Sequence, residues 1–339
     1  MQDVGGLGAE REHGGEQQRQ HEEGLPVPRV VTAVLHRQWD TRRVLSRRTL
    51  LLGGTAAAVV AGTAVGVEQG VLPGRPWLQA TLHLNGAAGT IPDVEPGPVE
   101  TGTFVSAARL GAETDWILIH PPGHHQHLPL VVALHGLGES PRTLTGPTFG
   151  LDGYLAAAVV DGVPPFAIAA ADGGTSYWHQ RPDGEDASAM VTDELLPLLG
   201  RHHGVRTDRF GLLGWSMGGY GALRLAGELG PDRVAAVVAA SPAIWSDPGD
   251  ASRSGFDDAA EYERYSVVGH QDDLDGIPVR VDVGTGDPFY RDVQDYVDSF
   301  PDGADVTSTF EPGAHDPAYW RRMLPDELAF LGRAVRSAS

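Results

Sequence analysis

A glycine-rich hexapeptide in the middle of the chain constrains the fold more than any other feature. Gly214-Trp215-Ser216-Met217-Gly218-Gly219 follows a short apolar run, residues 209–213, and precedes a helical pattern over residues 220–226. The apolar run is typical of a buried strand, so the hexapeptide marks a tight turn from a strand into a helix. Glycines are needed on both sides of the serine because larger side chains would clash in such a strained turn. The turn lifts the Ser216 hydroxyl clear of the sheet.

Strand-like and helix-like segments alternate from about residue 100 onward. This alternation predicts an α/β fold with a mostly parallel central sheet flanked by helices on both faces. The first two strands are joined by a short turn and are expected to pair antiparallel. The expected strands span residues 103–109, 116–120, 130–134, 166–170, 210–213, 234–239, 279–283 and 306–310, and the expected helices 153–160, 187–202, 218–229, 291–299 and 318–335.

A Gly-x-Ser-x-Gly sequence between a strand and a helix resembles the nucleophile elbow of α/β-hydrolases. A serine hydroxyl is a weak nucleophile until an imidazole accepts its proton, and an acid must fix the imidazole tautomer. In that fold the acid and the histidine follow the serine along the chain, on loops after later strands. Asp287 lies in a glycine-rich loop after the strand at 279–283, and His315 lies in the loop after the strand at 306–310. We therefore expect Ser216, Asp287 and His315 to form the catalytic set.

Other acids and histidines compete less well for these roles. Asp282 lies inside a predicted strand and is expected to face away from the site, and Asp287 itself has an alternative interpretation as a turn residue before proline. His270 lies in an acidic loop, and His202-His203 close a predicted helix. A third group of histidines crowds an early turn, where an exposed turn explains them better than a metal site: His124, His125 and His127.

An ester-cleaving serine also needs two backbone N–H groups that bind the oxyanion. The N–H of Met217, directly after the serine, is the first candidate. The second should come from the loop after the strand at 130–134, His135-Gly136-Leu137-Gly138, and we choose the N–H of Leu137.

Aromatic residues near the elbow are candidates for binding the substrate. Tyr177 and Trp178 lie in a loop that leaves the strand at 166–170 at the same edge of the sheet as the elbow, and Trp215 precedes the serine. Tyr177 and Trp178 are expected to wall an acyl or aryl pocket, with a plain surface loop as the alternative, and Trp215 is a further substrate-binding candidate. The acidic residues that follow in the same loop either bind an acceptor molecule or are simply solvated: Asp183, Glu185 and Asp186.

The chain resembles the esterase D-like family of α/β-hydrolases, which also includes feruloyl esterases and secreted mycolyltransferases. The matching segments are residues 214–223, the acid loop Gly286-Asp287-Pro288-Phe289, and Gly313-Ala314-His315 followed by Tyr319-Trp320. The resemblance covers about residues 100–335 and implies the same catalytic set. Mycolyltransferases tend to carry Ser-Met-Ala and a glutamate as the acid, so Ser-Met-Gly and Asp287 favour the hydrolytic esterases.

The N-terminal region carries an expected export signal. Arg47-Arg48 precedes an uncharged, mildly apolar run from Leu52 to Val67 and resembles a twin-arginine signal. We expect residues 41–66 to form this signal, cleaved after Ala64 or Gly66; a retained membrane anchor is the alternative. Residues 1–40 are expected to be disordered or an artefact of the gene model. Residues 67–99 are expected to be a linker, and residues 100–337 the catalytic domain.

Composition limits the chemistry further. The chain has no cysteine, which excludes disulfides, thiolate metal sites and a cysteine nucleophile. Its net charge of −20 disfavours nucleic acid as a partner. We expect an exported or envelope serine esterase that hydrolyses carboxylic esters through an acyl-enzyme, without cofactor or metal and without stable membrane insertion after signal cleavage. The alternatives are an acyltransferase that passes the acyl group to a sugar, and a non-catalytic envelope binding protein on a hydrolase scaffold.

Overall fold

The computed structural model describes residues 74–123 and 127–337. These residues belong to one compact unit. The expected disordered segment, the twin-arginine signal, His124 and His125 lie outside the described residues. In the part of the chain that is described, no helix has both the length and the apolar character needed to cross a membrane.

A single eight-stranded sheet organises the described chain, in the order β1-β2-β4-β3-β5-β6-β7-β8. β1 pairs antiparallel with β2, and β2 antiparallel with β4, whereas all the remaining neighbours are parallel. The expected mostly parallel α/β architecture is therefore confirmed. The strands are β1 (Val99–Ser106), β2 (Ala112–Ile119), β3 (Leu128–Leu134), β4 (Ala167–Ala171), β5 (Val205–Trp215), β6 (Val234–Ala240), β7 (Val279–Gly284) and β8 (Val306–Glu311).

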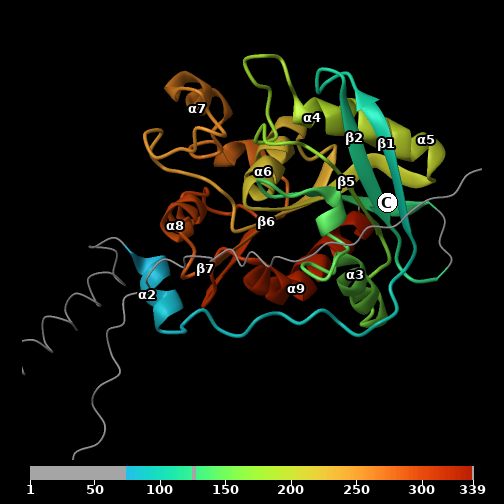
Figure 1. Ribbon diagram of the computed structural model, residues 1–339, viewed down its shortest axis with the longest axis horizontal. Helices are drawn as coiled ribbons and strands as arrows, with labels where there is room; N and C mark the ends of the chain where they lie inside the picture. Colours follow the sequence, from blue (N-terminus) through green and yellow to red (C-terminus); the bar gives the residue numbers. More distant parts are fainter. Residues whose placement is uncertain (1–73, 124–126, 338–339) are drawn as a thin grey trace, which may run out of the picture. The chain divides into compact units, whose positions relative to one another are not determined.

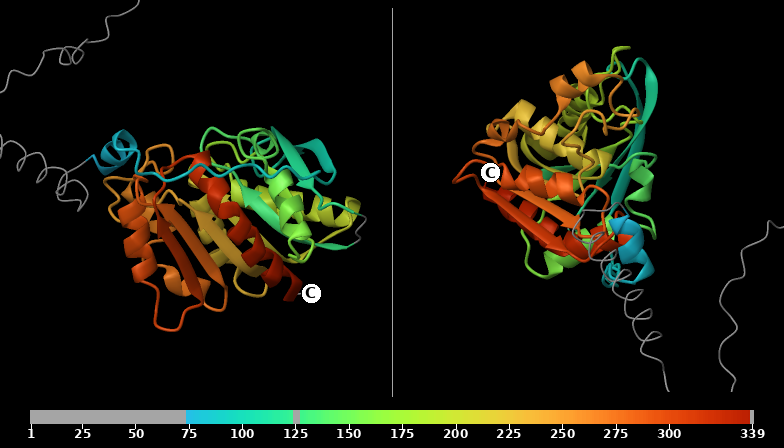
Figure 2. Two further views of the ribbon diagram at one scale, coloured as in Figure 1. Left: turned by 90° about the horizontal axis from the view of Figure 1, so that it is seen from below. Right: turned by 90° about the vertical axis from the view of Figure 1, so that its left-hand side faces the viewer.

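Helices cover both faces of the sheet (Figures 1 and 2). On one face α3 and α9 pack together and share a buried apolar cluster with alternate strand residues such as Val131 and Leu213. The other face is covered by α5, α6, α7 and α8, and its cluster contains the intervening residues such as Val132 and Leu212. Since successive side chains of a strand point to opposite faces, both faces of the central strands are apolar. The helical elements are α2 (Arg75–Thr81), η1 (Pro141–Thr143), α3 (Leu151–Val160), α4 (Ala187–Ala189), η2 (Met190–Leu195), α5 (Leu196–His202), α6 (Met217–Leu229), α7 (Ala259–Tyr265), η3 (Gln271–Leu274), α8 (Tyr290–Asp298) and α9 (Pro317–Ser337).

The expected helix at 187–202 is continuous but irregular. Its middle part, Met190–Leu195, is a π-helical turn between α4 and α5. Pro197 lies near the start of α5, where it lacks the N–H that a regular α-helix would use. A wider turn before the proline accommodates this missing hydrogen bond.

The segment before β1 packs against the rest of the described unit. The N–H of Gly89 donates to the carbonyl of Ala318 at the start of α9, and the Tyr154 hydroxyl of α3 donates to the carbonyl of Thr90. Near α2, the Thr285 hydroxyl donates to the Gln79 side chain at 3.3 Å. The described part of the expected linker is therefore attached to both α3 and α9 and to the loop after β7 (Figure 1).

Candidate active site

The turn after β5 places Ser216 at the carboxyl edge of the sheet. Ser216 has φ 55° and ψ −123°, a left-handed backbone conformation that is strained for a residue with a side chain. A Cβ on Gly214 would lie 2.1 Å from the carbonyl oxygen of Gly218, and a Cβ on Gly218 would lie 1.8 Å from that of Leu134. The glycines flanking the serine are thus required because β3, β5 and α6 meet there without space for a methyl group.

The strand register brings the other reactive side chains to the same edge. Gly214 is level with Leu134 of β3 and Ala239 of β6, and Ala240 is level with Asp282 of β7. The loops that follow β7 and β8 therefore open beside the serine. This edge is where α/β sheets generally bind their ligands.

Ser216, His315 and Asp287 form one hydrogen-bonded row. His315 Nε2 lies 2.9 Å from Ser216 Oγ, and His315 Nδ1 lies 2.8 Å from Asp287 Oδ2. Asp287 is only 2% exposed, and its other oxygen accepts the N–H of Phe289 at 2.8 Å. Because a carboxylate only accepts, the proton of neutral His315 resides on Nδ1, which leaves Nε2 free to accept the serine proton.

Two aromatic rings contact the His315 imidazole, one from a residue earlier in the chain and one from a residue later in it. Phe289 and Trp320 each contact it edge-on, with ring centroids 5.2 Å apart in both pairs. Phe289 in turn packs edge-on against Trp245. These contacts restrict the orientation of the imidazole while leaving it partly exposed, as a proton-transferring group requires.

The loop after β3 places backbone N–H groups near the serine. Met217 is the first residue of α6, so its N–H has no acceptor within the helix. In the β3 loop the N–H of Gly136 donates to Glu139 Oε2 and the N–H of Glu139 to the carbonyl of Gly136. These two amides are therefore engaged within the loop, and the N–H of Leu137 stays the second oxyanion donor that the sequence predicts.

The three aromatic residues expected to bind substrate lie in the core instead. Trp178 is 1% exposed, and its indole N–H donates to the carbonyl of His135. Trp215 is also 1% exposed and stacks on Phe149 at 4.2 Å between centroids. Tyr177 is 4% exposed. These rings hold loops together, and they present almost no surface to a substrate.

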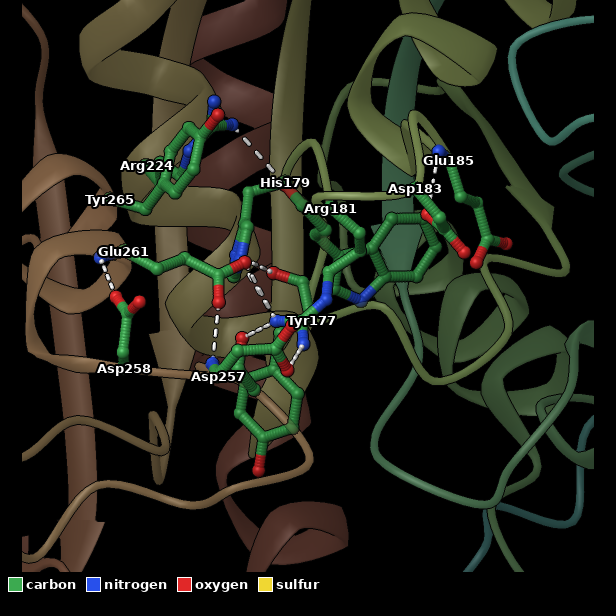
Figure 3. Close-up of polar contacts among 12 residues, drawn as sticks. Tyr177, His179, Arg181, Asp183, Glu185, Arg224, Asp257, Asp258, Glu261 and Tyr265 are labelled. Carbon is green, nitrogen blue, oxygen red and sulfur yellow. Dashed lines mark hydrogen bonds and ion pairs between the residues drawn. The ribbon is translucent and has the colours of Figure 1, made fainter.

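The acidic residues considered for an acceptor site are engaged within the protein. Glu185 pairs with Arg109 at 3.0 Å. Asp186 caps α4 by accepting the N–H of Ala189, and Asp183 accepts the N–H of Glu185. Figure 3 shows Asp183 and Glu185 apart from the other labelled polar groups of this region. A sugar bound there would share these carboxylates with their present partners.

A polar cluster around buried His179 and Glu261 instead joins the same loop to α7 (Figure 3). Arg181 pairs with Glu261 at 3.1 Å and with Asp257 at 2.7 Å, and it also donates to the carbonyl of Gly255. Fully buried His179 lies 3.4 Å from Glu261. Burial, together with the charges of Arg224 and Arg181, lowers the pKa of His179 to about 3, so this histidine is neutral and structural.

The competing acids and histidines make their polar contacts with residues other than Ser216. Asp282 is fully buried inside β7, where it pairs with Arg280 at 2.7 Å. His203 and His120 contact Glu100 at 2.7 Å, and exposed His270 pairs with Asp273. Within the described residues no group of histidine, aspartate or glutamate side chains is arranged to hold a metal ion.

Sequence reasoning did not identify Glu139, whose carboxylate joins the β3 loop to the Trp215 indole at 2.6 Å. It also did not identify Trp245 beside Phe289. Neither residue belongs to a recognisable local pattern. The proximity of Glu139 to Trp215 arises only from the pairing of β3 with β5, which no local signal in the sequence reveals.

Comparisons with solved structures support this fold. The fluorophosphonate-binding serine hydrolase F of Staphylococcus aureus is 18% identical, with a TM-score of 0.58, over 70% of this chain and 99% of that one. An S-formylglutathione hydrolase from Agrobacterium tumefaciens is 19% identical, with a TM-score of 0.55, over 74% and 98%. A ferulic acid esterase from Anaeromyces mucronatus is 19% identical, with a TM-score of 0.57, over 73% and 94%.

Among proteins of curated function, none matches the sequence significantly. A family model does match, over residues 107–331, which includes the serine turn, the acid loop and the histidine loop. The family is described as "Putative esterase". The chain belongs to this esterase family, and it is a carboxylic ester hydrolase with an α/β-hydrolase fold.

Proposed function

We propose that the protein is an exported serine esterase that cleaves small-molecule or envelope carboxylic esters through an acyl-enzyme on Ser216. His315 accepts the Ser216 proton as Oγ attacks the ester carbonyl carbon, and Asp287 stabilises the imidazolium that forms. The N–H groups of Met217 and Leu137 bind the oxyanion. The intermediate collapses when the C–O bond to the alcohol breaks and His315 returns its proton to the leaving oxygen. Water then attacks the acyl-enzyme while His315 accepts its proton, and collapse of the second intermediate releases the acid and returns that proton to Ser216.

One observation carries the proposal: the unbroken row from Ser216 Oγ through both nitrogens of His315 to buried Asp287, at 2.9 and 2.8 Å. A protein that only bound esters would not need this proton path. The row argues against the interpretation as a non-catalytic binding protein.

Water is the proposed final acceptor of the acyl group. A sugar acceptor would need a polar site beside Ser216 that binds it well enough to compete with water. The acidic residues considered for that site already have partners inside the protein, which supports hydrolysis over transfer. The test incubates enzyme, an acyl donor and glucose or trehalose, and quantifies free acid against acyl sugar. Predominance of acyl sugar at millimolar acceptor would replace the hydrolase with a transferase.

The esterase assignment is tested at the serine. Ser216→Ala should lower turnover of p-nitrophenyl esters by about 10⁵–10⁶-fold while the fold is retained, because only binding and the oxyanion donors remain. A fluorophosphonate should label the wild type at Ser216 alone. Ser254→Ala, at an exposed serine of the loop before α7, is the matched control and should retain full activity. Labelling elsewhere, or an active Ser216→Ala variant, contradicts the assignment. A series of acyl chain lengths then defines the preferred ester.

Export through the twin-arginine pathway rests on Arg47-Arg48 and the mildly apolar run that follows. Replacing both arginines by lysine should leave the precursor in the cytoplasm. Because this pathway carries folded cargo, the trapped protein should still hydrolyse esters. Normal export of the double variant would contradict this part of the proposal.

A further inference from the structure

The loop after β3, which carries the second oxyanion donor Leu137, contains an internal hydrogen-bonded turn. The N–H of Glu139 donates to the carbonyl of Gly136 at 3.2 Å, and Gly138 adopts a left-handed φ of 76°. This turn defines the conformation of the loop. It does not by itself define the position of the loop relative to Ser216, which follows a different strand, β5.

A single carboxylate oxygen connects the loop to the strand that carries the serine. Glu139 Oε2 accepts the N–H of Gly136 at 3.1 Å and the indole N–H of Trp215 at 2.6 Å. Gly136 also lies directly beside the serine: a Cβ there would be 3.2 Å from Glu139 Oε2 and 3.5 Å from Ser216 Cβ. The carboxylate is thus a bridge between the residue before Leu137 and the residue before Ser216.

The indole of Trp215 is a rigid anchor for this bridge. It is 1% exposed, stacks on Phe149 and lies beside Trp320, which in turn contacts His315. A ring packed in this way has no freedom to follow a moving loop. The hydrogen bond therefore transmits the fixed position of Trp215 to the loop.

We propose that Glu139 is a positioning residue, which holds the N–H of Leu137 at the oxyanion through its bonds to Gly136 and Trp215. This inference rests on the proposed esterase mechanism and assigns a role to Trp215 other than substrate binding. Glu139 also occupies the N–H of Gly136, so that this amide does not compete for the oxyanion. The role requires an acceptor oxygen at the place of Oε2, and it does not require a negative charge.

Two substitutions break this bridge, one at its acceptor and one at its indole donor. Glu139→Ala removes the acceptor, and Trp215→Phe removes the indole N–H while keeping an aromatic ring against Phe149. Glu139→Gln keeps one oxygen that can accept both N–H groups. Glu263→Ala, at an exposed glutamate of α7, is the matched control, and circular dichroism checks that each variant is folded.

The assay compares an ester with its thionoester, in which sulfur replaces the carbonyl oxygen. Sulfur is larger and accepts hydrogen bonds poorly, so the thionoester gains little from oxyanion donors. Loss of a whole donor costs about 10²–10³-fold in kcat, and we expect displacement of one to cost about 10–100-fold. Glu139→Ala should show this loss in kcat for the ester, with KM nearly unchanged and a much smaller loss for the thionoester. Glu139→Gln and Glu263→Ala should remain close to wild type.

The outcomes separate this inference from the mechanism on which it rests. Equal losses for ester and thionoester, an unchanged kcat in folded Glu139→Ala, or no rescue by Glu139→Gln would each overturn the positioning role. Should Glu139→Ala fail to fold, Trp215→Phe must show the selective loss for the ester, and its absence would overturn the role. Failure of the esterase mechanism looks different, because the wild type would then show no Ser216-dependent ester turnover and both proposals would fall.

Discussion

Replacing Asp287 by asparagine tests the proposed proton path at its most buried point. The substitution keeps the shape of the side chain and removes its charge. Asp287 Oδ1 accepts the N–H of Phe289 at 2.8 Å, so the amide oxygen of Asn should take that place. The amide NH₂ then faces His315 Nδ1, at the position where Oδ2 now lies 2.8 Å away. A donor there forces the imidazole proton onto Nε2, which can no longer accept the proton of Ser216.

The structure also limits the escape from this inactive tautomer. Turning the amide over would place NH₂ against the N–H of Phe289, and a buried unsatisfied donor costs about 1–3 kcal/mol. Asp287 is 2% exposed, so water cannot readily fill the gap. Even the turned form lacks the charge that stabilises the imidazolium. We therefore expect kcat to fall by about 10⁴-fold, as in other catalytic sets of this kind, which corresponds to about 5 kcal/mol of barrier.

The measurement is steady-state hydrolysis of a p-nitrophenyl ester, with unfolding curves as the check on folding. Asp282→Asn is the matched control, because this carboxyl is also buried at the end of the sheet but pairs with Arg280 and not with His315. It should leave kcat within a few-fold of wild type. A loss below about 100-fold for Asp287→Asn, or a larger loss for Asp282→Asn, would refute the assignment of the acid.

Three further predictions concern stability. Gly218→Ala would place a methyl carbon 1.8 Å from the Leu134 carbonyl oxygen, and it should destabilise the folded protein by more than the roughly 1–3 kcal/mol that is usual for overpacking. Gly153→Ala in α3, where the nearest contact of the new methyl carbon is at 3.5 Å, should be neutral or stabilise the protein by up to about 1 kcal/mol. Thermal unfolding compares the two variants. Burial and arginine charges lower the pKa of His179 to about 3. As pH drops from about 6.5 toward 3, the unfolded chain therefore binds a proton at this histidine before the folded chain does, and the free energy of unfolding should fall. Urea titrations should show a smaller fall for His179→Asn. Burial and a neighbouring aspartate raise the pKa of Glu327, so the folded chain holds this proton more tightly than the unfolded chain and stability should decline as pH rises above 4.5. Glu327→Gln should therefore raise the free energy of unfolding at pH 7, measured by urea unfolding, and a lower value would contradict the raised pKa.

Most of the fold followed from local sequence patterns. Alternating apolar runs and amphipathic stretches place all eight strands, the helices α3, α6, α8 and α9, and the continuous helix formed by α4, η2 and α5, because buried strands and surface helices have distinct periodicities. The short elements α2, η1, α7 and η3 were not predicted. Each is seven residues or shorter, and such elements are stabilised by tertiary contacts more than by their own periodicity.

The sequence by itself determined which residues meet at the candidate active site. Ser216, Asp287 and His315 each follow a strand of a parallel sheet, and the carboxyl ends of parallel strands share one edge. Glycine at positions 214 and 218 belongs to the same local pattern around the serine, although the contact that excludes a methyl group at position 218 is with Leu134 of β3. Chain order and local turn chemistry are enough to bring these groups together.

Only the tertiary structure decided what surrounds that site. Trp178 and Trp215 look like substrate-binding residues from their place beside the elbow, yet both are 1% exposed and pack within the core. Glu139 looks like an ordinary loop residue, yet it accepts from the Trp215 indole at 2.6 Å. The physical reason is the same in each case. A strand's pattern defines which side chains alternate between faces, but the packing of two loops from separate strands decides whether a side chain meets solvent, substrate or protein.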